Sequence, residues 1–423
     1  MNRQMPLHRR LQQRGAATLV VVMVLFFLML LVSAYAGRTL IFEQRTSANQ
    51  YRAAQAYEAA AGGLEWALAM LNSGQRINEA CEPTTNPLDN TFRDRYLSME
   101  LDTGKVNPTT PSSGLFAACV HGAEGWRCQC PIGSSPTLGT NTDAGATFML
   151  EMRPLSAFAP AGPIAITSWG CSTSNDSRCF PGGAISSDAT ATHTMRVALV
   201  SALQQPPTAA LTSPGEVVVP AGMTVVNQVP GGSAVAIRSG ADISGPGIPS
   251  ALALPAGVPA DDGLVRGDSQ IALRPVRLFM LHAGIAQNVF RELPSTAACY
   301  GNSCEDTLLN AAVNGRRLLY VFGNLTLPPN TSLGSPERPV MLVVDGKLTL
   351  QGLTNITGLV YAEQLDWVNG ASAAFVRGGT LVRGSCCLGI SGSPSLIYDR
   401  DVLRRLQLGA GAYARVPGSW QDK

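Results

Sequence analysis

An uncharged and strongly apolar run occupies residues 15–37 of this 423-residue chain. It follows a basic leader that carries arginines at positions 3, 9, 10 and 14. A helix of that length extends about 35 Å, which is enough to cross the ~30 Å hydrocarbon core of a bilayer. The arginines then predict that the N-terminus lies in the cytoplasm and that the rest of the chain lies on the other side of the membrane.

The helical pattern continues past the apolar run. No proline occurs between Ala16 and Asn72. Apolar residues recur at alternating spacings of four and three, at Tyr57, Ala61, Leu64, Leu68 and Leu71. This spacing is typical of one face of a helix. We therefore predict a single helix over residues 16–72, with its first half in lipid, its second half on a globular domain, and a weak point at Gly62-Gly63.

Three polar motifs occur within this predicted helix, and a family resemblance rests on them. They are Glu43-Gln44-Arg45, Asn49-Gln50-Tyr51-Arg52 and Glu58-Ala59-Ala60. With them, the stretch from Arg14 to Leu71 resembles the N-terminus of a type IV prepilin, and most closely that of the PilX-type minor pilins. The resemblance implies that a prepilin peptidase cuts after Gly15 and that the new amine of Ala16 is methylated.

Two positions depart from the usual prepilin pattern. Ala16 replaces the more common Phe or Met, and Val20 stands at the fifth mature position, where major pilins carry a glutamate. The resemblance then implies a minor pilin that primes assembly of a type IV pilus or caps its tip. Its implied partners are other minor pilins, the major pilin and the prepilin peptidase. Its implied location is the inner membrane, and then the pilus outside the cell.

Some residues of the helix have implied roles in the filament. They are Val20, Glu43, Arg45, Asn49, Arg52 and Glu58. A type II secretion pseudopilin would share this N-terminus, and we keep it as an alternative. After removal of the leader the chain is close to neutral, so it has no basic footprint that would predict nucleic-acid binding.

Changes in composition and in apolar pattern along the chain divide it into four segments. We predict a leader over 1–15, the filament helix over 16–72, a pilin-like α/β roll over 73–205 and a β-rich domain over 206–423. Three strand-like runs at 147–152, 164–170 and 193–200 supply an antiparallel sheet for the helix, and Gln204-Gln205-Pro206-Pro207 marks the boundary. The predicted fold class is α+β.

The last segment contains an internal sequence repeat. The run at 317–327 is repeated at 340–350, and shorter runs of the same kind follow at 359–362 and 375–378. The small residues after the apolar runs, Gly323, Gly346, Ala362 and Gly378, are 23, 16 and 16 residues apart. Such a period predicts stacked β-solenoid rungs, to which the runs at 216–219 and 234–237 can belong. An irregular β-sandwich is the alternative.

All ten cysteines follow the membrane segment, and their number is even. They are Cys81, Cys119, Cys128, Cys130, Cys171, Cys179, Cys299, Cys304, Cys386 and Cys387. In an oxidising compartment this predicts disulfides. Local closure is the simplest interpretation for Cys171 with Cys179 and for Cys299 with Cys304. A vicinal bridge and separate partners are both open for Cys386 and Cys387.

Two metal sites are weaker alternatives. Cys119, His121, Cys128 and Cys130 supply a donor set that tetrahedral zinc accepts, although the spacing is unusual. Asp261, Asp262 and Asp268, around Gly263, supply hard oxygens for calcium, although a solvated turn is the better explanation for them. We favour disulfides and a turn, and we predict no cofactor.

Residues typical of catalysis are sparse, and we predict that the chain is not an enzyme. The alternative is a membrane-tethered β-helix enzyme that acts on polysaccharides, for which Asp345, Glu363 and Asp366 are the candidate carboxylates. Aromatic residues at Tyr361, Trp367 and Trp420 could form a surface patch for carbohydrate, but burial in the rungs is the default interpretation.

Overall fold

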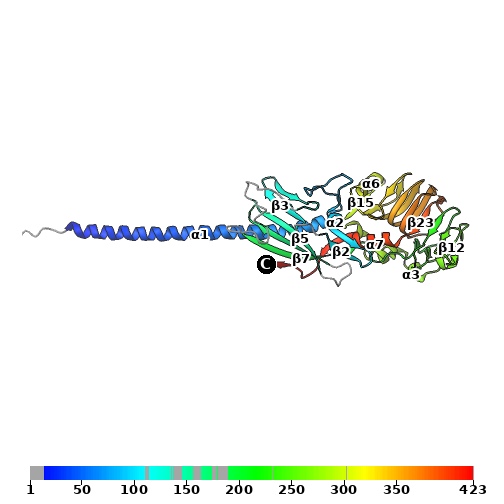
Figure 1. Cartoon of the computed structure of the whole chain (residues 1–423), viewed down its shortest axis with the longest axis horizontal. Coiled ribbons are helices and arrows are strands. Elements are labelled where there is room, and N and C mark those ends of the chain that lie inside the picture. The colour runs from blue at the N-terminus through cyan, green and yellow to red at the C-terminus, as the bar shows by residue number, and fades with distance from the viewer. Residues whose placement is uncertain are drawn as a thin grey trace, which may run out of the picture.

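One long helix followed by two globular parts makes up the molecule, with the parts arranged in line (Figure 1). The computed structural model describes residues 14–109, 114–134, 136, 145–155, 163–173, 179, 189–230, 232–301 and 303–422. Most of the predicted leader and the interior of the Cys171–Cys179 loop, residues 174–178, lie outside the described residues, as do the side chains of residues 14–16.

The long helix α1 runs over Arg14–Asn72, as the sequence predicts. Residues 17–54 of α1 are almost entirely exposed, and the C-terminal turns lie on the sheet of the first globular part. The buried face is lined by Ala56, Ala60, Leu64, Ala67 and Leu71. The apolar face predicted from the sequence is therefore rotated about the helix axis from the face that is buried. Tyr57, which we expected on the buried face, is 43% exposed, because the smaller Ala56 and Ala60 face the sheet in its place.

Two glycines explain why the small face of α1 packs against the sheet. A Cβ at Gly63 would overlap Ser168 Oγ and lie 2.8 Å from a ring carbon of Phe148. A Cβ at Gly170 would overlap the backbone of Ala56 and Ala60 in α1. Because neither side leaves room for another carbon, helix and sheet approach more closely than larger residues would permit.

The first globular part, hereafter the roll, is an antiparallel sheet in the order β24-β7-β6-β5-β3-β4. The predicted strands are present as β5 (Thr147–Pro154), β6 (Ile164–Cys171) and β7 (Thr190–Ser201). The sequence analysis predicted no strand at β3 (Ala117–Gly122) or β4 (Gly125–Gln129), which complete one side of the sheet. The short elements α2 (Phe92–Tyr96), β1 (Leu97–Glu100) and β2 (Lys105–Pro108) lie beside this sheet.

The end of the chain returns to the roll. Strand β24 (Gly411–Arg415) pairs antiparallel with β7, and β25 (Gln421–Asp422) extends the same pairing. The sequence placed 206–423 in one β-rich domain, whereas these last strands lie in the sheet of the first part. The second part is thus inserted between β7 and β24, and the chain joins the two parts at more than one point.

The second globular part is a β-solenoid, and the sandwich alternative does not hold. Its strands pair in parallel register, for example Leu319 opposite Leu342, and Val360 opposite Thr380. The strands form three rows, corresponding to three faces. The first row contains β15 (Thr296–Tyr300), β16 (Leu318–Phe322), the first half of β19 (Val340–Gln351), the middle of β20 (Asn355–Gly370), the end of β21 (Phe375–Val382), β8 (Leu211–Ser213), β11 (Ile237–Ser239) and β14 (Leu264–Val265).

The other two rows repeat the same stacking. The second contains β17 (Leu325–Leu327), the ends of β19 and β20, β22 (Ile390–Gly392), β9 (Val217–Val218) and β12 (Ile243–Ser244). The third contains β18 (Ser332–Leu333), the starts of β20 and β21, β23 (Ser395–Tyr398), β10 (Thr224–Val226) and β13 (Leu252–Ala253). The interior between the rows is apolar and continuous.

The rungs do not stack in the order of the sequence. Strand β8 pairs with β21, and β10 pairs with β23, so the rung at 211–226 stacks on the rung at 380–398. The rungs that come first in the chain therefore form the distal half of the solenoid, far from α1, as the position of β12 in Figure 1 shows. The chain then returns to the proximal end before it builds β16 to β23.

The register of the paired strands also differs in part from the predicted sequence repeat. Phe322 lies opposite Asp345, which aligns Gly323 with Gly346 as expected. Gly378, however, lies opposite Gly358, and Ala362 lies opposite Val382. Gly378 and Ala362 are therefore not equivalent, because the corners between rungs differ in length.

Short helices cover the first row from outside. They are α3 (Ser269–Ala272), α4 (Leu278–Ala283), α5 (Gln287–Arg291) and α7 (Arg400–Gly409), with a 3₁₀ turn at Pro275–Arg277. Another 3₁₀ turn, Ala260–Gly263, directly precedes β14. Helix α6 (Glu305–Val313) lies instead against β15, β16 and β17, with Leu308 in the interior core. Phe279 and Phe290 pack with Tyr320 and Tyr361, whose rings point outward from the row. The first row is thus buried on both sides.

All ten cysteines are paired in the structure. Three bridges lie in the roll: Cys81–Cys130, Cys119–Cys128 and Cys171–Cys179. Two lie in the solenoid: Cys299–Cys304 and the vicinal Cys386–Cys387. The zinc alternative loses its ligands, because Cys119 and Cys128 are bonded to each other and Cys130 is bonded to Cys81.

The bridges are expected to differ in what they contribute. Cys81 and Cys130 are 49 residues apart, and Cys299 and Cys304 are 5 apart. Chain entropy then predicts that loss of the first bridge costs about 4 kcal/mol and loss of the second about 2 kcal/mol. Urea unfolding of the two double Cys→Ala variants in detergent micelles checks this. If loss of Cys299–Cys304 cost as much as loss of Cys81–Cys130, or more, the result would contradict this pairing of the cysteines.

Candidate functional site

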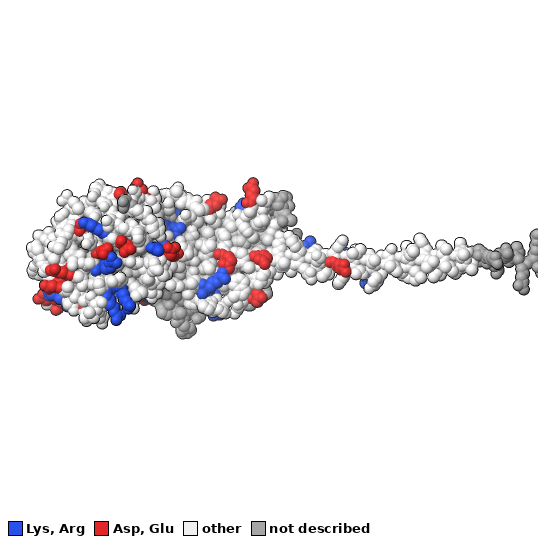
Figure 2. All heavy atoms as spheres, turned by 180° about the vertical axis from the view of Figure 1, so that it is seen from behind, with Lys and Arg blue, Asp and Glu red and all other residues white. Residues whose placement is uncertain are grey.

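The exposed part of α1 is an apolar shaft. Val20 is 57% exposed, and the large apolar residues from Leu19 to Val32 are uncovered in the same way. In Figure 2 this shaft is almost free of charged side chains, in contrast to the two globular parts. The helix is long and apolar enough to cross a membrane. An uncovered apolar surface of this kind requires lipid or the helices of other subunits around it.

A polar stripe follows the apolar shaft toward the roll. Arg45, Asn49 and Arg52 lie at helical spacings in line with Ala56 and Ala60, which face the sheet. By the same geometry, Glu43 and Glu58 lie toward the opposite side of the helix. Basic and acidic residues on different sides let neighbouring helices of the same kind pair their charges.

The sequence-predicted helix residues do not form one compact site. Gly15 and Ala16 lie in the first turn of α1, and Glu58 lies about 63 Å further along the helix axis. All of Val20, Glu43, Arg45, Asn49, Arg52 and Glu58 are exposed. They form an extended surface, which suits lateral contact with other helices better than the binding of a small ligand.

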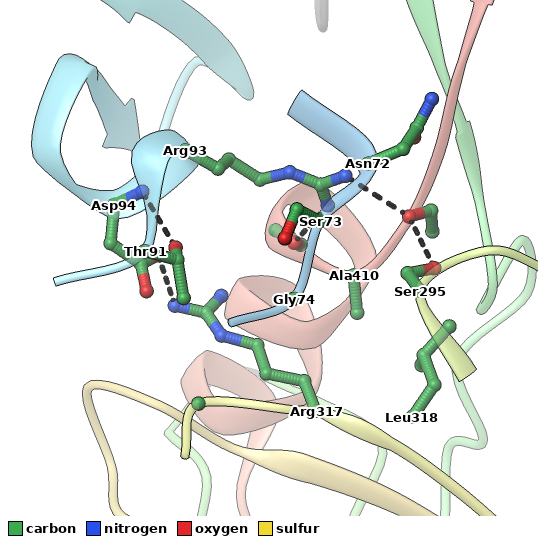
Figure 3. Close-up of a pocket in the computed structure, with 13 residues that line it drawn as sticks. Asn72, Ser73, Gly74, Thr91, Arg93, Asp94, Ser295, Arg317, Leu318 and Ala410 are labelled. Atoms are coloured by element: carbon green, nitrogen blue, oxygen red, sulfur yellow. Dashed lines mark hydrogen bonds and ion pairs between the residues drawn. The ribbon is translucent and has the colours of Figure 1, made fainter. Parts of the chain in front are cut away.

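A second candidate site lies where α1 ends and the two globular parts meet (Figure 3). The Arg93 side chain, from α2, donates to the carbonyl of Leu71 at 2.7 Å, to that of Gly409 at 2.9 Å and to that of Gly411 at 3.2 Å. These carbonyls belong to the last turns of α1 and α7 and to the start of β24. A cation there satisfies free carbonyls and opposes two helix dipoles.

Burial lowers the pKa of Arg93 from its ordinary value. That ordinary value is so high that the guanidinium remains charged at neutral pH. Its plane also lies over the ring of Tyr413, at 4.8 Å from the centroid. Arg93 therefore ties α1 to the returning C-terminal segment.

An ion pair joins the roll to the solenoid at the same place. Asp94 Oδ1 lies 2.6 Å from Arg317 Nη2, and both side chains are only 11% exposed. Arg317 directly precedes β16, which pairs with β15 at the proximal end of the first row. Arg338 contributes a second positive charge, with its Nε 3.8 Å from Asp94 Oδ2. A pair this well buried fixes geometry more than it adds net stability.

Hydrogen bonds close the rest of the junction. Asn72, the last residue of α1, donates to the Tyr413 carbonyl at 2.9 Å and accepts from the Tyr413 N–H at 2.7 Å. Ser295 donates to the Gly411 carbonyl at 2.9 Å. The remaining cavity is about 30 Å³, which is room for a water molecule rather than for a ligand. The junction is a structural joint that sets the direction of the solenoid on α1.

The residues proposed for other chemistry are engaged elsewhere. Glu363 pairs with Arg383 at 2.5 Å, and Asp366 pairs with Lys347, so two of the three candidate carboxylates are neutralised. Tyr361 and Trp367 are buried. Trp420 packs against His193, so these three aromatics form no surface patch.

The calcium alternative also fails to assemble. Asp268 caps α3 by accepting from the Gln270 N–H and pairs with Arg238 at 2.5 Å. Asp261 lies 3.8 Å from Arg266. Among the described residues, no three His, Cys, Asp or Glu side chains gather where they could hold a metal ion.

Sequence reasoning missed the junction residues. Asp94 and Arg317 are 223 positions apart, so no local pattern links them. One signal was available: α2 reads Phe92-Arg93-Asp94-Arg95-Tyr96, with three charges in five residues, in a chain of which only 14% is charged. Charges that dense between two buried aromatics indicate buried polar contacts.

Comparison with known proteins bears on the N-terminal segment. Residues 14–65 match the PilX N-terminal family. Over these residues the chain is type IV pilin-like. The matched segment contains the apolar shaft and the polar stripe, and it ends where α1 is already packed on the roll.

Comparison with solved structures gives a second similarity. The competence-associated pilin ComZ from Thermus thermophilus is similar over 88% of this chain and 97% of its own, with 11% sequence identity and a TM-score of 0.21. A TM-score that low supports no inference about the present chain. No curated protein matches the sequence.

Proposed function

We propose that this pilin-like chain is a minor pilin that primes assembly of a type IV pilus or caps its tip. In this account a prepilin peptidase cuts after Gly15 and methylates Ala16, and α1 leaves the inner membrane to join the helical core of the fibre. The observation that carries the proposal is the 38-residue exposed stretch of α1 at 17–54, joined to a roll and in line with a distal solenoid.

Val20 supports a position at the start of the fibre. A glutamate within a packed apolar core is costly unless it is paired. In the pilins that this chain resembles, the partner of that glutamate is the N-terminal amine of a neighbouring subunit. Val20 needs no such partner, yet the Ala16 amine remains available to a neighbour's glutamate. A subunit of this kind suits the first position, where it lacks one neighbour.

The shape of the molecule supports the same position. The solenoid extends the molecule at the end opposite the free part of α1 (Figure 1). If α1 runs along the fibre axis with its N-terminus toward the base, the solenoid projects in the direction of the tip. Subunits added earlier would occupy that space in the shaft, whereas the first subunit has it free.

Processing is the first test. We expect mass spectrometry of the protein from membranes to show a mature N-terminus at methylated Ala16. Gly15→Glu is expected to leave the precursor uncut, because the peptidase must accommodate the residue before the cut. A conservative change outside the motif, Gln13→Asn, serves as the control. A mature chain that begins after residue 37 would indicate ordinary secretion and contradict the proposal.

Deletion is the second test. We expect a strain without this chain to make and process the major pilin normally but to show a sharp drop in the number of fibres. Re-expression of the full chain should restore them. Normal piliation would refute a priming role, and normal pili with defective protein secretion would favour the pseudopilin alternative.

A further inference from the structure

Apolar side chains are exposed on the segment that leaves the distal end of the solenoid. Leu273 is 81% exposed and Val276 is 77% exposed, and Met280 and Leu281 are also uncovered. They follow one another over α3, the 3₁₀ turn and α4. Large apolar residues clustered on a surface mark an interaction site, whereas isolated ones need no explanation. We call Leu273, Arg274, Val276, Arg277, Met280 and Leu281 the distal patch.

The distal patch carries positive charge that no nearby acid in sequence neutralises. Arg274 and Arg277 are both exposed, and residues 269–291 contain no Asp or Glu. Asp268, which directly precedes this stretch, is already paired with Arg238 at 2.5 Å. His282 is turned inward, with Nδ1 2.7 Å from the Gln205 carbonyl, and burial lowers the pKa of this histidine.

A hollow of about 210 Å³ lies between α3 and α4 within the patch. Its walls are Gln270, Ile271, Arg274, Arg277, Leu278, Met280 and Leu281. Guanidinium groups recognise phosphate through paired hydrogen bonds, which ammonium groups cannot offer in that geometry. Apolar side chains beside them can enter the boundary between headgroups and acyl chains.

We propose that the distal patch docks on the anionic phospholipid surface of a bilayer. Arg274 and Arg277 contact headgroup phosphates, while Leu273 and Val276 insert among the acyl chains. A lipid surface fits better than a protein partner because the patch has no exposed aromatic residue, and aromatics dominate the energetic centres of protein interfaces. The patch lies far from the free part of α1, so it can meet a second bilayer. The inference does not depend on the proposed function.

The test keeps the full chain and separates α1 from the surface under study. The protein is placed in nanodiscs of phosphatidylcholine, which occupy α1. Fluorescent vesicles of phosphatidylcholine, alone or with phosphatidylglycerol, are then added, and capture is measured by flotation. We expect capture of the anionic vesicles only. Arg274→Glu/Arg277→Glu should weaken capture by about 30-fold or more, because each arginine near an anionic surface contributes about fivefold.

Matched variants make the result decisive. Leu273→Ser/Val276→Ser should weaken capture of anionic vesicles while keeping the charge. Arg400→Glu, which reverses a side chain that is 66% exposed outside the patch, should leave capture unchanged. Equal capture of neutral vesicles, no capture of either kind, or undiminished capture by the double arginine variant would overturn the proposal. So would binding of labelled polyglutamate without any capture of vesicles, because that would assign the patch to an acidic polypeptide.

Discussion

Replacement of Asp94 by asparagine is expected to lower the free energy of unfolding by about 3–5 kcal/mol. The carboxylate of Asp94 is the ion-pair partner of Arg317, and both side chains are almost completely buried. The variant leaves the charge of Arg317 in a poorly solvated place with a neutral neighbour. Urea unfolding of the full chain in detergent micelles, followed by circular dichroism, measures the change.

Two further variants isolate the buried pair. Glu65→Gln removes the charge from an exposed pair, Glu65 with Arg415, that also joins distant segments. That change should cost no more than about 1 kcal/mol. Asp94→Asn/Arg317→Gln should be less destabilised than the sum of its single changes, because neither charge is then left alone. Equal costs for Asp94→Asn and Glu65→Gln would contradict the importance of the junction.

Adjacent glycines in α1 should respond in opposite ways to the same substitution. Gly63→Ala places a methyl group against Ser168 and Phe148 of the sheet. Overpacking of this kind typically costs about 1–3 kcal/mol. The expected consequence is a looser roll, since α1 must move away from β5 and β6. Near-ultraviolet dichroism of the full chain reports the loss, because Trp66 packs against Phe92 and Phe148.

Gly62→Ala is the matched control. A Cβ at Gly62 meets no atom within 4 Å. Alanine there gains helix propensity without a clash, and the roll should become more stable by up to about 1 kcal/mol. If both substitutions destabilised the protein, or if neither did, Gly63 would not be required for the close approach of α1 to the sheet.

Much of the fold could be predicted from the sequence because it rests on local periodicity. The absence of proline and the spacing of apolar residues predicted α1 almost to the residue, and three strand-like runs predicted β5, β6 and β7. The repeat at 318–350 predicted parallel rungs because equivalent residues must stack. In each case the signal lies within a short window of the chain.

Pairings between distant segments could not be predicted in this way. No pattern within a short window of the sequence indicates that the rung at 211–226 stacks on the rung at 380–398, or that β24 pairs with β7. The face of α1 was misjudged for a related reason: Ala56 and Ala60 are buried because Gly170 lies opposite them in space. The junction of Arg93, Asp94 and Arg317 is likewise a property of the assembled molecule.

The position of the solenoid in the fibre decides whether this chain occupies the tip. Antibodies raised against residues 210–423 can be applied to intact pili and visualised by immunogold electron microscopy, with the major pilin labelled by gold of another size. We expect sparse labelling by the antibody at one end of each fibre, and none in the deletion strain. Regular labelling along the shaft would contradict a position at the tip, because the solenoid would then have to fit between neighbouring subunits.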